Sequence, residues 1–268
     1  MMLRSHCIRD RQCDDCDFRS ECIVQRVMYS QMEIQPAFMT SGDSVGYVLE
    51  CEDYREHFKE GDDLSFNLIL FGKTIVYFSQ FIDAFYRLGM SGIGKNRSRF
   101  TIKSITNTKK KPILSGNDVL MNAYTVGRLE EYIDWRVKKA DISKGHIIKF
   151  KTPLSLKCKG EKLYEFNAEA IIKAIARRVY MMDCFEGIEA STGDIELDKE
   201  IQILSETHRN VGVPRYSSRQ ESKMTLWGIE GEISIDKVSE ETLKLLYAGE
   251  LLHIGKNTSF GFGRYRVI

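Results

Sequence analysis

Four of the seven cysteines fall within the first 22 residues, a density typical of metal ligands. Their spacing is C-x5-C-x2-C-x5-C, at Cys7, Cys13, Cys16 and Cys22. The central pair lets two thiolates hold one ion from a tight turn, and the outer pair completes a tetrahedral site. Such a site would be structural and would hold either zinc or an iron–sulfur cluster. The alternative is that all four are plain reduced thiols.

A second feature is a repeated glycine loop. The segment 93–98 (IGKNRS) recurs 161 residues later as 254–259 (IGKNTS), with five of six positions identical. Glycines remove side-chain bulk, so a polymer backbone can approach the main chain, and exposed N–H groups there bind anions. The lysine and the hydroxyls add phosphate donors, and Phe260, Phe262 and Tyr265 offer stacking faces for bases. The alternative is an ordinary tight turn between a helix and a strand.

Positive charge accompanies the glycine loops. Residues 89–117 carry seven cations and no carboxylate, whereas residues 183–206 carry eight carboxylates and one lysine. A basic stretch beside glycines suits a groove for a phosphate backbone, and a solvated charged face is the alternative. The candidate nucleic-acid-binding residues are Gly92, Gly94, Lys95, Arg97, Arg99, Arg215, Arg219, Lys223, Asn257, Ser259, Gly261, Gly263 and Arg264.

The elements that position the first loop follow from the hydrophobic pattern. Residues 63–71 and 97–105 alternate as strands, and residues 73–88 have a helical period that Gly89 should end. The first unit has no convincing first strand before it.

The same order, strand, helix, glycine loop, strand, surrounds the second loop. Residues 225–235 predict a strand or hairpin, and residues 264–268 a closing strand. Between them, a helix over 240–248 is capped by Ser239 and should end at Gly249. Upstream, the pattern predicts a strand over 145–156 and a helix over 168–182 with Asn167 as its N-cap.

This duplicated order predicts an α+β fold of two βαββαβ units. We place their junction near residues 109–112. The predicted organisation is a cysteine-rich N-terminal segment (1–32), a first unit (33–110) and a second unit with the glycine-rich loop (111–268).

Composition excludes several classes of protein. The chain has 268 residues and 30.9 kDa, with 43% hydrophobic and 29% charged residues, which suits a protein with a buried core. Its net charge of +1 excludes a general polycation. The longest apolar runs, 68–71 and 75–78, are far shorter than a membrane span, and the first residues do not read as a signal peptide. These features predict a cytoplasmic protein without a membrane partner.

The motifs together resemble a known family. The segment GKNTSFGFGRY (255–265) resembles the glycine-rich loop of the CRISPR-associated RAMP superfamily. RYSSRQ (215–220), GIEG (228–231) and LHIGK (252–256) resemble one branch of it, the endoribonucleases that cut precursor CRISPR RNA within its repeats. The cysteine run and Gly92-Ile-Gly94 fit the same branch. The resemblance implies two tandem ferredoxin-like, RRM-related domains facing a basic cleft that holds repeat RNA.

The resemblance also implies a reaction without a catalytic cofactor, in which a ribose 2′-OH attacks the adjacent phosphate. This chemistry requires proton transfer, for which histidine is suited, and a cation beside the phosphorane. His253 abuts the glycine loop and is our first candidate, with a structural histidine or an RNA contact as alternatives. His6 lies where the family tends to keep its catalytic histidine, with a metal ligand or an exposed terminus as alternatives. Tyr29 and Lys256 are candidates for proton transfer and charge neutralisation, or for binding alone.

The expected partners are CRISPR repeat RNA and subunits of a CRISPR effector complex. Two other functions stay open on the residues alone. The first is a non-catalytic RAMP subunit that binds the mature CRISPR RNA. The second is a metal-stapled structural protein whose glycine loops are only turns.

Overall fold

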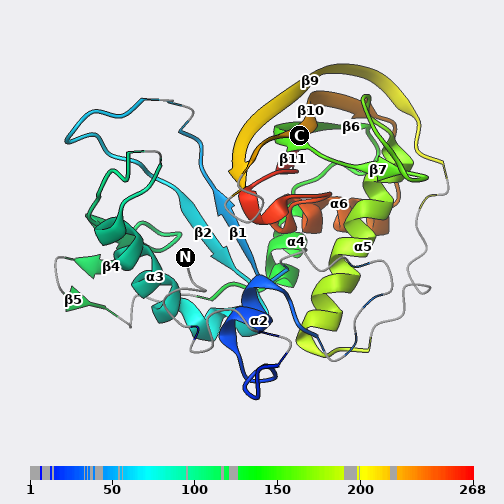
Figure 1. Cartoon of the computed structure of the whole chain (residues 1–268). Coiled ribbons are helices and arrows are strands. Elements are labelled where there is room, and N and C mark those ends of the chain that lie inside the picture. Colours follow the sequence, from blue (N-terminus) through cyan, green and yellow to red (C-terminus); the bar gives the residue numbers. More distant parts are fainter. Residues whose placement is uncertain are drawn as a thin grey trace.

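The structure is a computed structural model that describes residues 7, 13, 15–32, 34, 36, 39, 45–53, 55, 57–94, 96–115, 118–120, 126–189, 198, 200–217 and 222–268. In these residues helices and strands alternate in an α+β fold, as predicted (Figure 1).

The C-terminal half is one complete βαββαβ unit. Its elements are β6 (His146–Leu154), α5 (Ala168–Glu186), β9 (Ile203–Ser217), β10 (Ser222–Ile235), α6 (Glu240–Leu252) and β11 (Tyr265–Val267). The strands form an antiparallel sheet in the order β11-β6-β10-β9. The short strands β7 (Lys157–Cys158) and β8 (Glu161–Lys162) pair separately, and helix α4 (Leu129–Val137) precedes β6 and packs beside α6.

The core of this unit lies between the sheet and the helices α5 and α6. Along β6 buried and exposed residues alternate, so one face of the sheet is apolar. Ile148 and Ile233 from the strands meet Ile175 and Leu246 from the helices in this core. Both predicted caps are confirmed: Asn167 accepts a hydrogen bond from the Ala170 N–H, and Ser239 one from the Thr242 N–H.

Two glycines predicted to end helices lie inside them instead. Helix α3 (Phe78–Ser91) runs past Gly89, and α6 runs past Gly249. A side chain at Gly89 would collide with the carbonyl oxygen of Phe100, and one at Gly249 with the hydroxyl of Tyr265. These glycines are therefore required by close packing rather than by a helix end.

The described part of the N-terminal half has the order helix, strand, strand, helix, which is the middle of a βαββαβ unit. Helix α2 (Ile23–Met28) precedes the antiparallel pair β1 (Tyr47–Glu50) and β2 (Asn67–Leu70); the 3-10 helix η1 (Gly72–Tyr77) leads into α3. A small core joins these elements. After α3, the chain forms a separate sheet of β3 (Ser104–Thr106), β4 (Pro112–Ser115) and β5 (Asp118–Val119). The strand predicted over 97–105 is thus mostly loop.

Strand β1 joins the two halves. The buried guanidinium of Arg178 on α5 donates to the carbonyl of Val45, just before β1, and to that of Leu252 at the end of α6. Glu186, the last residue of α5, accepts a hydrogen bond from the Lys73 N–H. The start of β1 is therefore tied to the helices of the C-terminal unit. Among the described residues, no helix is long and apolar enough to cross a membrane.

Candidate nucleic-acid interface

The second glycine loop, residues 253–263, is attached to the end of β6 along its length. Helix α6 ends where His253 takes a positive φ of 54° with ψ 156°. The Lys256 N–H donates to the carbonyl of Ser155 at 2.7 Å, and the Gly263 N–H donates to that of Pro153 at 3.0 Å. Between these bonds the 3-10 helix η3 (Thr258–Phe260) forms the tip of the loop.

The glycines of this loop pack against the protein itself. A Cβ at Gly255 would lie 2.5 Å from the carbonyl oxygen of Ser155, and one at Gly261 would lie 2.5 Å from that of Leu49 in β1. A Cβ at Gly263 would overlap the carbonyl of Ile254. The prediction that these glycines present bare backbone to a polymer is therefore wrong, because the chain's own backbone already occupies that space.

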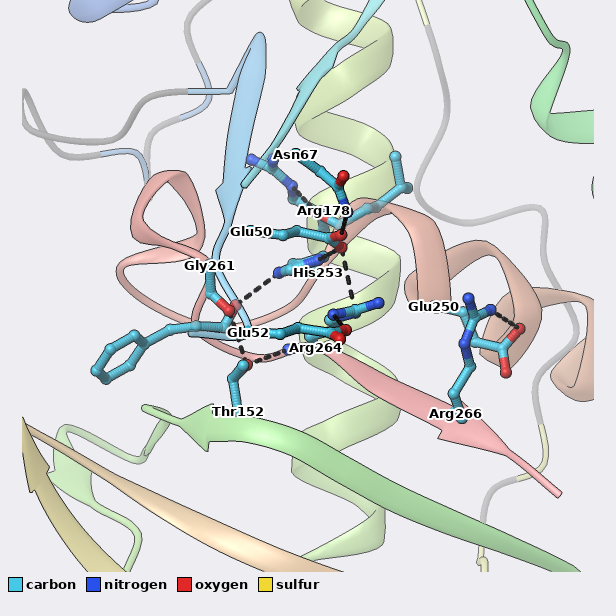
Figure 2. Close-up of polar contacts among 12 residues, drawn as sticks. Glu50, Glu52, Asn67, Thr152, Arg178, Glu250, His253, Gly261, Arg264 and Arg266 are labelled. Atoms are coloured by element: carbon cyan, nitrogen blue, oxygen red, sulfur yellow. Dashed lines mark hydrogen bonds and ion pairs between the residues drawn. The ribbon is translucent and has the colours of Figure 1, made fainter. Parts of the chain in front are cut away.

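A buried polar network holds the loop against β1 (Figure 2). The ring of His253 is fully buried, with Nδ1 3.1 Å from the carbonyl oxygen of Phe262 and Nε2 2.8 Å from a carboxylate oxygen of Glu50. Asn67 on β2 donates to the other carboxylate oxygen of Glu50 at 3.2 Å. The guanidinium of Arg264 lies 3.2 Å from Glu50. Both groups that face the His253 ring are hydrogen-bond acceptors.

Thr152 on β6 also belongs to this network. Its hydroxyl donates to the carbonyl of Gly261 at 2.7 Å and accepts from the Arg264 N–H at 2.9 Å. Arg264 also pairs with Glu52, which follows β1 (Figure 2). The loop is thus held between β1 and β6 by bonds on both sides.

The network predicts an acid-dependent stability. Burial raises the pKa of Glu50, but the hydrogen bonds from His253 and Asn67 and the charge of Arg264 outweigh it, so the pKa lies below its ordinary value of 4.5. A lowered carboxylate pKa stabilises the fold above the ordinary value, and this contribution is lost as the pH falls through the folded pKa. We expect Glu50→Gln to unfold more easily than the wild type at pH 7, with the difference shrinking below pH 4.5.

Denaturant unfolding at a series of pH values measures this effect. Glu52→Gln is the matched control, because Glu52 bonds the same arginine but its side chain is 71% exposed. If both variants show the same pH dependence as the wild type, the network does not contribute in this way.

Burial changes the roles of several predicted site residues. His253, Ser259, Gly261 and Gly263 are buried, and the side chain of Arg264 is held by two carboxylates. His253 has both ring nitrogens engaged within the protein, which does not suit a group that exchanges protons with bound RNA. Phe262 and Tyr265 are also buried, so they offer no stacking face. These residues build the loop.

The exposed part of the loop is its tip. Lys256 and the aromatic ring of Phe260 are solvent-exposed, and Asn257 is half-buried with a left-handed backbone. The guanidinium of Arg215 on β9 lies over the Phe260 ring at 4.2 Å. We call Arg215, Lys256 and Phe260 the loop-tip cluster. It offers cations and an aromatic face together, as binding to single-stranded nucleic acid requires.

A shallow hollow lies beside the loop-tip cluster and is joined to it by Ser155. Ser155 lines this hollow and pairs through its backbone with Lys256. Two exposed aromatic residues, Tyr164 and Trp227, line it as well. Neither was among the predicted site residues, although an exposed tryptophan at an outward-facing strand position is a usable signal.

The first glycine loop keeps its tip open. A Cβ at Gly92 would collide with the carbonyl of Arg97 in the same loop, whereas Gly94 has open space around it. Arg97 and Arg99 are exposed, as is Lys223 on β10. Lys95 and Arg219 lie outside the described residues. The crowded glycine of the first loop thus contacts its own loop, whereas Gly255 and Gly261 of the second loop contact Ser155 and β1.

The remaining candidate catalytic residues are not gathered at one point. Tyr29 follows α2 and is half-buried, and His6 lies outside the described residues. In the described chain, neither Tyr29 nor Lys256 has a hydrogen bond to His253. The placement of these residues therefore leaves their predicted roles untested.

The predicted metal site has no support in the described structure. All four N-terminal cysteines are among the described residues, and none of the four forms a disulfide there. Within that part of the chain, no three histidine, cysteine or acidic side chains come together as a group of metal ligands.

Comparison with protein families relates both halves to known sequences. Residues 148–265, which include the second glycine loop, match the family model described as CRISPR-associated endoribonuclease Cas6. Residues 1–126 match the family model AF_1859_N, described as an N-terminal domain. A comparison with curated proteins finds no match.

Several solved structures resemble the chain. A product complex of Thermus thermophilus Cas6 has 14% identity and a TM-score of 0.50, covering 91% of this chain and 89% of that one. A second Cas6 product complex has 18% identity and a TM-score of 0.45, covering 83% and 84%. A chain of a partial Cas6-RT-Cas1–Cas2 complex has 14% identity and a TM-score of 0.49, covering 83% and 39%. The first of these likenesses shows a shared fold.

Proposed function

From the premise that residues 148–265 of this chain belong to the CRISPR-associated endoribonuclease family Cas6, we propose that the protein cuts precursor CRISPR RNA within its repeats without a metal ion. The observation that carries the proposal is the family match, which spans β6 to β11 and includes the loop-tip cluster. The proposed partners are repeat RNA and other CRISPR proteins, including effector-complex subunits.

The proposed reaction is an internal transesterification. A base removes the proton of a ribose 2′-OH, and this oxygen forms a bond to the adjacent phosphorus. The bond between phosphorus and the 5′-oxygen breaks, and an acid protonates the leaving oxygen. The products are a 2′,3′-cyclic phosphate and a 5′-OH. A cation is needed beside the phosphorane, where negative charge accumulates.

Residue roles follow from exposure. Lys256 is exposed at the loop tip and is our candidate for neutralising the phosphorane. Because His253 is enclosed, we assign it a positioning role and propose His6 for proton transfer, with Tyr29 as a second candidate. The remaining described histidines are His57 and His208, which are exposed, and His146, which is buried.

Cleavage of the repeat RNA in EDTA tests the proposal. We expect one defined cut per repeat at the same rate with and without EDTA. A repeat RNA carrying a 2′-deoxynucleotide immediately 5′ of the cut should stay intact, because the attacking oxygen is missing. Cleavage of this deoxy substrate, or a product with a 3′-OH end, would contradict the proposed chemistry. Tight binding without any cleavage would favour a non-cutting RNA-binding subunit.

The loop-tip cluster predicts a specific loss of RNA affinity. Phe260→Ala removes a stacking face and the ring beneath Arg215, so we expect repeat RNA to bind about 5- to 150-fold more weakly, the equivalent of about 1–3 kcal/mol for one stacked base. Lys256→Ala should weaken binding and reduce the slope of log affinity against log salt by about 0.7, the value for one phosphate contact on a single strand. Equilibrium binding at several salt concentrations measures both.

Phe58→Ala is the matched control for Phe260→Ala. Phe58 is similarly exposed and has the guanidinium of Arg55 over its ring at 4.5 Å, but it lies in the N-terminal half. Equal losses of affinity in the two variants would show that the loop tip has no special contact with RNA.

A further inference from the structure

A basic cavity lies at the edge strand β11, away from the His253 network. It has a volume of about 620 Å³ and opens between the end of α4, the start of β6 and α6. Its cations are Arg136, Lys139, Lys144, Lys151 and Arg266, and Asp141 is the one acidic side chain in its lining. In Figure 2 Arg266 lies beside Glu250, apart from the residues that surround His253.

Two of these cations are fixed from behind by a buried carboxylate. Glu250 on α6 is 2% exposed and lies 3.3 Å from the guanidinium of Arg136 and 3.5 Å from that of Arg266. The hydroxyl of Tyr132 on α4 bonds both Glu250 and Arg266. Burial and the hydrogen bond to Glu250 raise the pKa of Tyr132 to about 12, so its proton stays in place. The arginines are thus preorganised at the cavity wall.

The lysines leave positive charge for a ligand. Lys144 pairs with Asp141 at 2.9 Å. Lys139 and Lys151 form no ion pair with any carboxylate of the described residues. The ammonium of Lys139 instead lies 4.3 Å from the ring centre of Trp135, which is half exposed at the cavity. The aromatic ring of Trp135 thus lies next to cations that have no acidic partner among the described residues.

His146, at the start of β6, adds an unsatisfied polar atom. Its side chain lines the cavity and is 6% exposed, and its buried Nε2 has no hydrogen-bond partner among the described residues. Burial lowers the pKa of His146, so the ring is neutral at pH 7. Leaving a buried polar atom unpaired costs about 1–3 kcal/mol.

We propose that this cavity binds one or two consecutive nucleotides of single-stranded RNA, with the phosphates at Lys139, Lys151 and Arg266 and a base against Trp135. The volume lies in the range that holds a small organic ligand. The aromatic face favours a nucleotide over a bare phosphate, and the cations favour a phosphodiester over a neutral ligand. The assignment rests on the proposed function, because the RNA is the strand that the enzyme processes.

Tryptophan fluorescence can report on this cavity alone. The chain has two tryptophans, Trp135 at the cavity and Trp227 at the hollow. In Trp227→Phe, Trp135 is the only tryptophan, and we expect its fluorescence to be quenched when a single-stranded oligoribonucleotide is added. Saturable RNA binding, measured by anisotropy of the labelled strand, without any change in Trp135 fluorescence would overturn the proposal.

Charge reversal gives an independent test. In the Lys139→Glu/Lys151→Glu double variant we expect RNA affinity to fall at least 10-fold and the salt slope to decrease by about 1.4, for two contacts. Lys59→Glu/Lys173→Glu is the control with the same net charge, since both lysines are exposed and neither lines the cavity. Equal losses in the two double variants would overturn the site.

His146→Phe separates a ligand contact from a structural role. Replacing an unpaired buried polar atom by an apolar ring should leave stability unchanged or raised, while quenching of Trp135 by RNA is weakened. Lower stability with unchanged quenching would overturn the role of His146 as a ligand contact.

Competitors identify the ligand, and cleavage separates the two proposals. Adenosine monophosphate, inorganic phosphate or an acidic peptide should not reverse the quenching at concentrations near that of the RNA; reversal by any one of them would replace the strand assignment. Quenching without cleavage of repeat RNA would overturn the proposed function and keep the cavity as an RNA site. Cleavage of repeat RNA, with no loss of affinity in the Lys139→Glu/Lys151→Glu variant, would keep the proposed function and overturn the cavity as an RNA site.

Discussion

Replacing His253 by alanine is expected to lower the free energy of unfolding by about 3 kcal/mol, the effect of removing the buried hydrogen-bond partner of a carboxylate together with a buried ring. The imidazole fills a fully buried position and bridges the carbonyl of Phe262 and the carboxylate of Glu50. In its absence Glu50 keeps Asn67 and Arg264 but loses its shortest hydrogen bond. Denaturant unfolding measures the change. The affinity for RNA, which we propose to bind at the loop tip, should fall only as far as the loop loosens.

His253→Gly isolates the contribution of the backbone. The positive φ of His253 with its extended ψ is a region that glycine adopts freely and other residues do not. The corresponding position in the first copy of the loop is Gly92, with φ 78° and ψ 157°. We therefore expect His253→Gly to be about 1 kcal/mol more stable than His253→Ala, although glycine ordinarily destabilises relative to alanine. If the glycine variant is the less stable one, strain at this position is not significant.

Replacing His6 by alanine is expected to slow cleavage of repeat RNA by about 10²- to 10⁴-fold, the usual contribution of a general acid or base. The described structure encloses His253 and buries His146, so the proposed proton transfer has to come from another histidine or from Tyr29. Affinity for the uncut RNA should stay within about twofold of the wild type, because proton transfer contributes to the reaction rather than to binding. Single-turnover cleavage with enzyme in excess measures the chemical step.

His57→Ala and His208→Ala are the controls for His6→Ala. Both side chains are exposed, and His208 is paired with Glu206 on the same strand. We expect both variants to cleave at nearly the wild-type rate. A normal rate in His6→Ala, with loss of cleavage in either control, would move the proton-transfer role to that histidine.

The local signals for helices predicted much of the C-terminal half. Hydrophobic periodicity with the caps Asn167 and Ser239 located α5 and α6, and alternation located β6. These features depend on residues close in the chain, so the sequence contains them. Both helices run a few residues further than predicted: α5 ends at Gly187, which has a left-handed backbone, and α6 ends at His253, which has a positive φ.

Strand β9 and the two misjudged glycines were missed for different reasons. Strand β9 lies at the edge of the sheet and contains Pro214 and several polar residues, so its pattern does not alternate clearly. Gly89 and Gly249 fit a helix-ending signal, but they are needed where another segment approaches the helix. A single sequence does not reveal which neighbour will lie there.

The candidate site shows the same limit. The sequence predicted RNA contact for several residues of the glycine loop that the structure uses to hold the loop in place. A glycine that leaves room for the backbone of a bound RNA and a glycine that leaves room for the chain's own backbone look the same in the sequence. Only the partners of His253 and Gly261, which come from β1 about 200 residues earlier, distinguish the two.

The second glycine loop separates the end of β6 from β1. Gly255 lies against Ser155 and Gly261 lies against Leu49, so at both points the separation is that of backbone packed on backbone. An added methyl group at either glycine would act as a wedge, because backbone on the facing strand leaves no room to yield. Such a wedge would alter the separation and tilt of the two halves. The distance between β1 and the end of β6 is therefore set by the absence of a side chain at these two glycines.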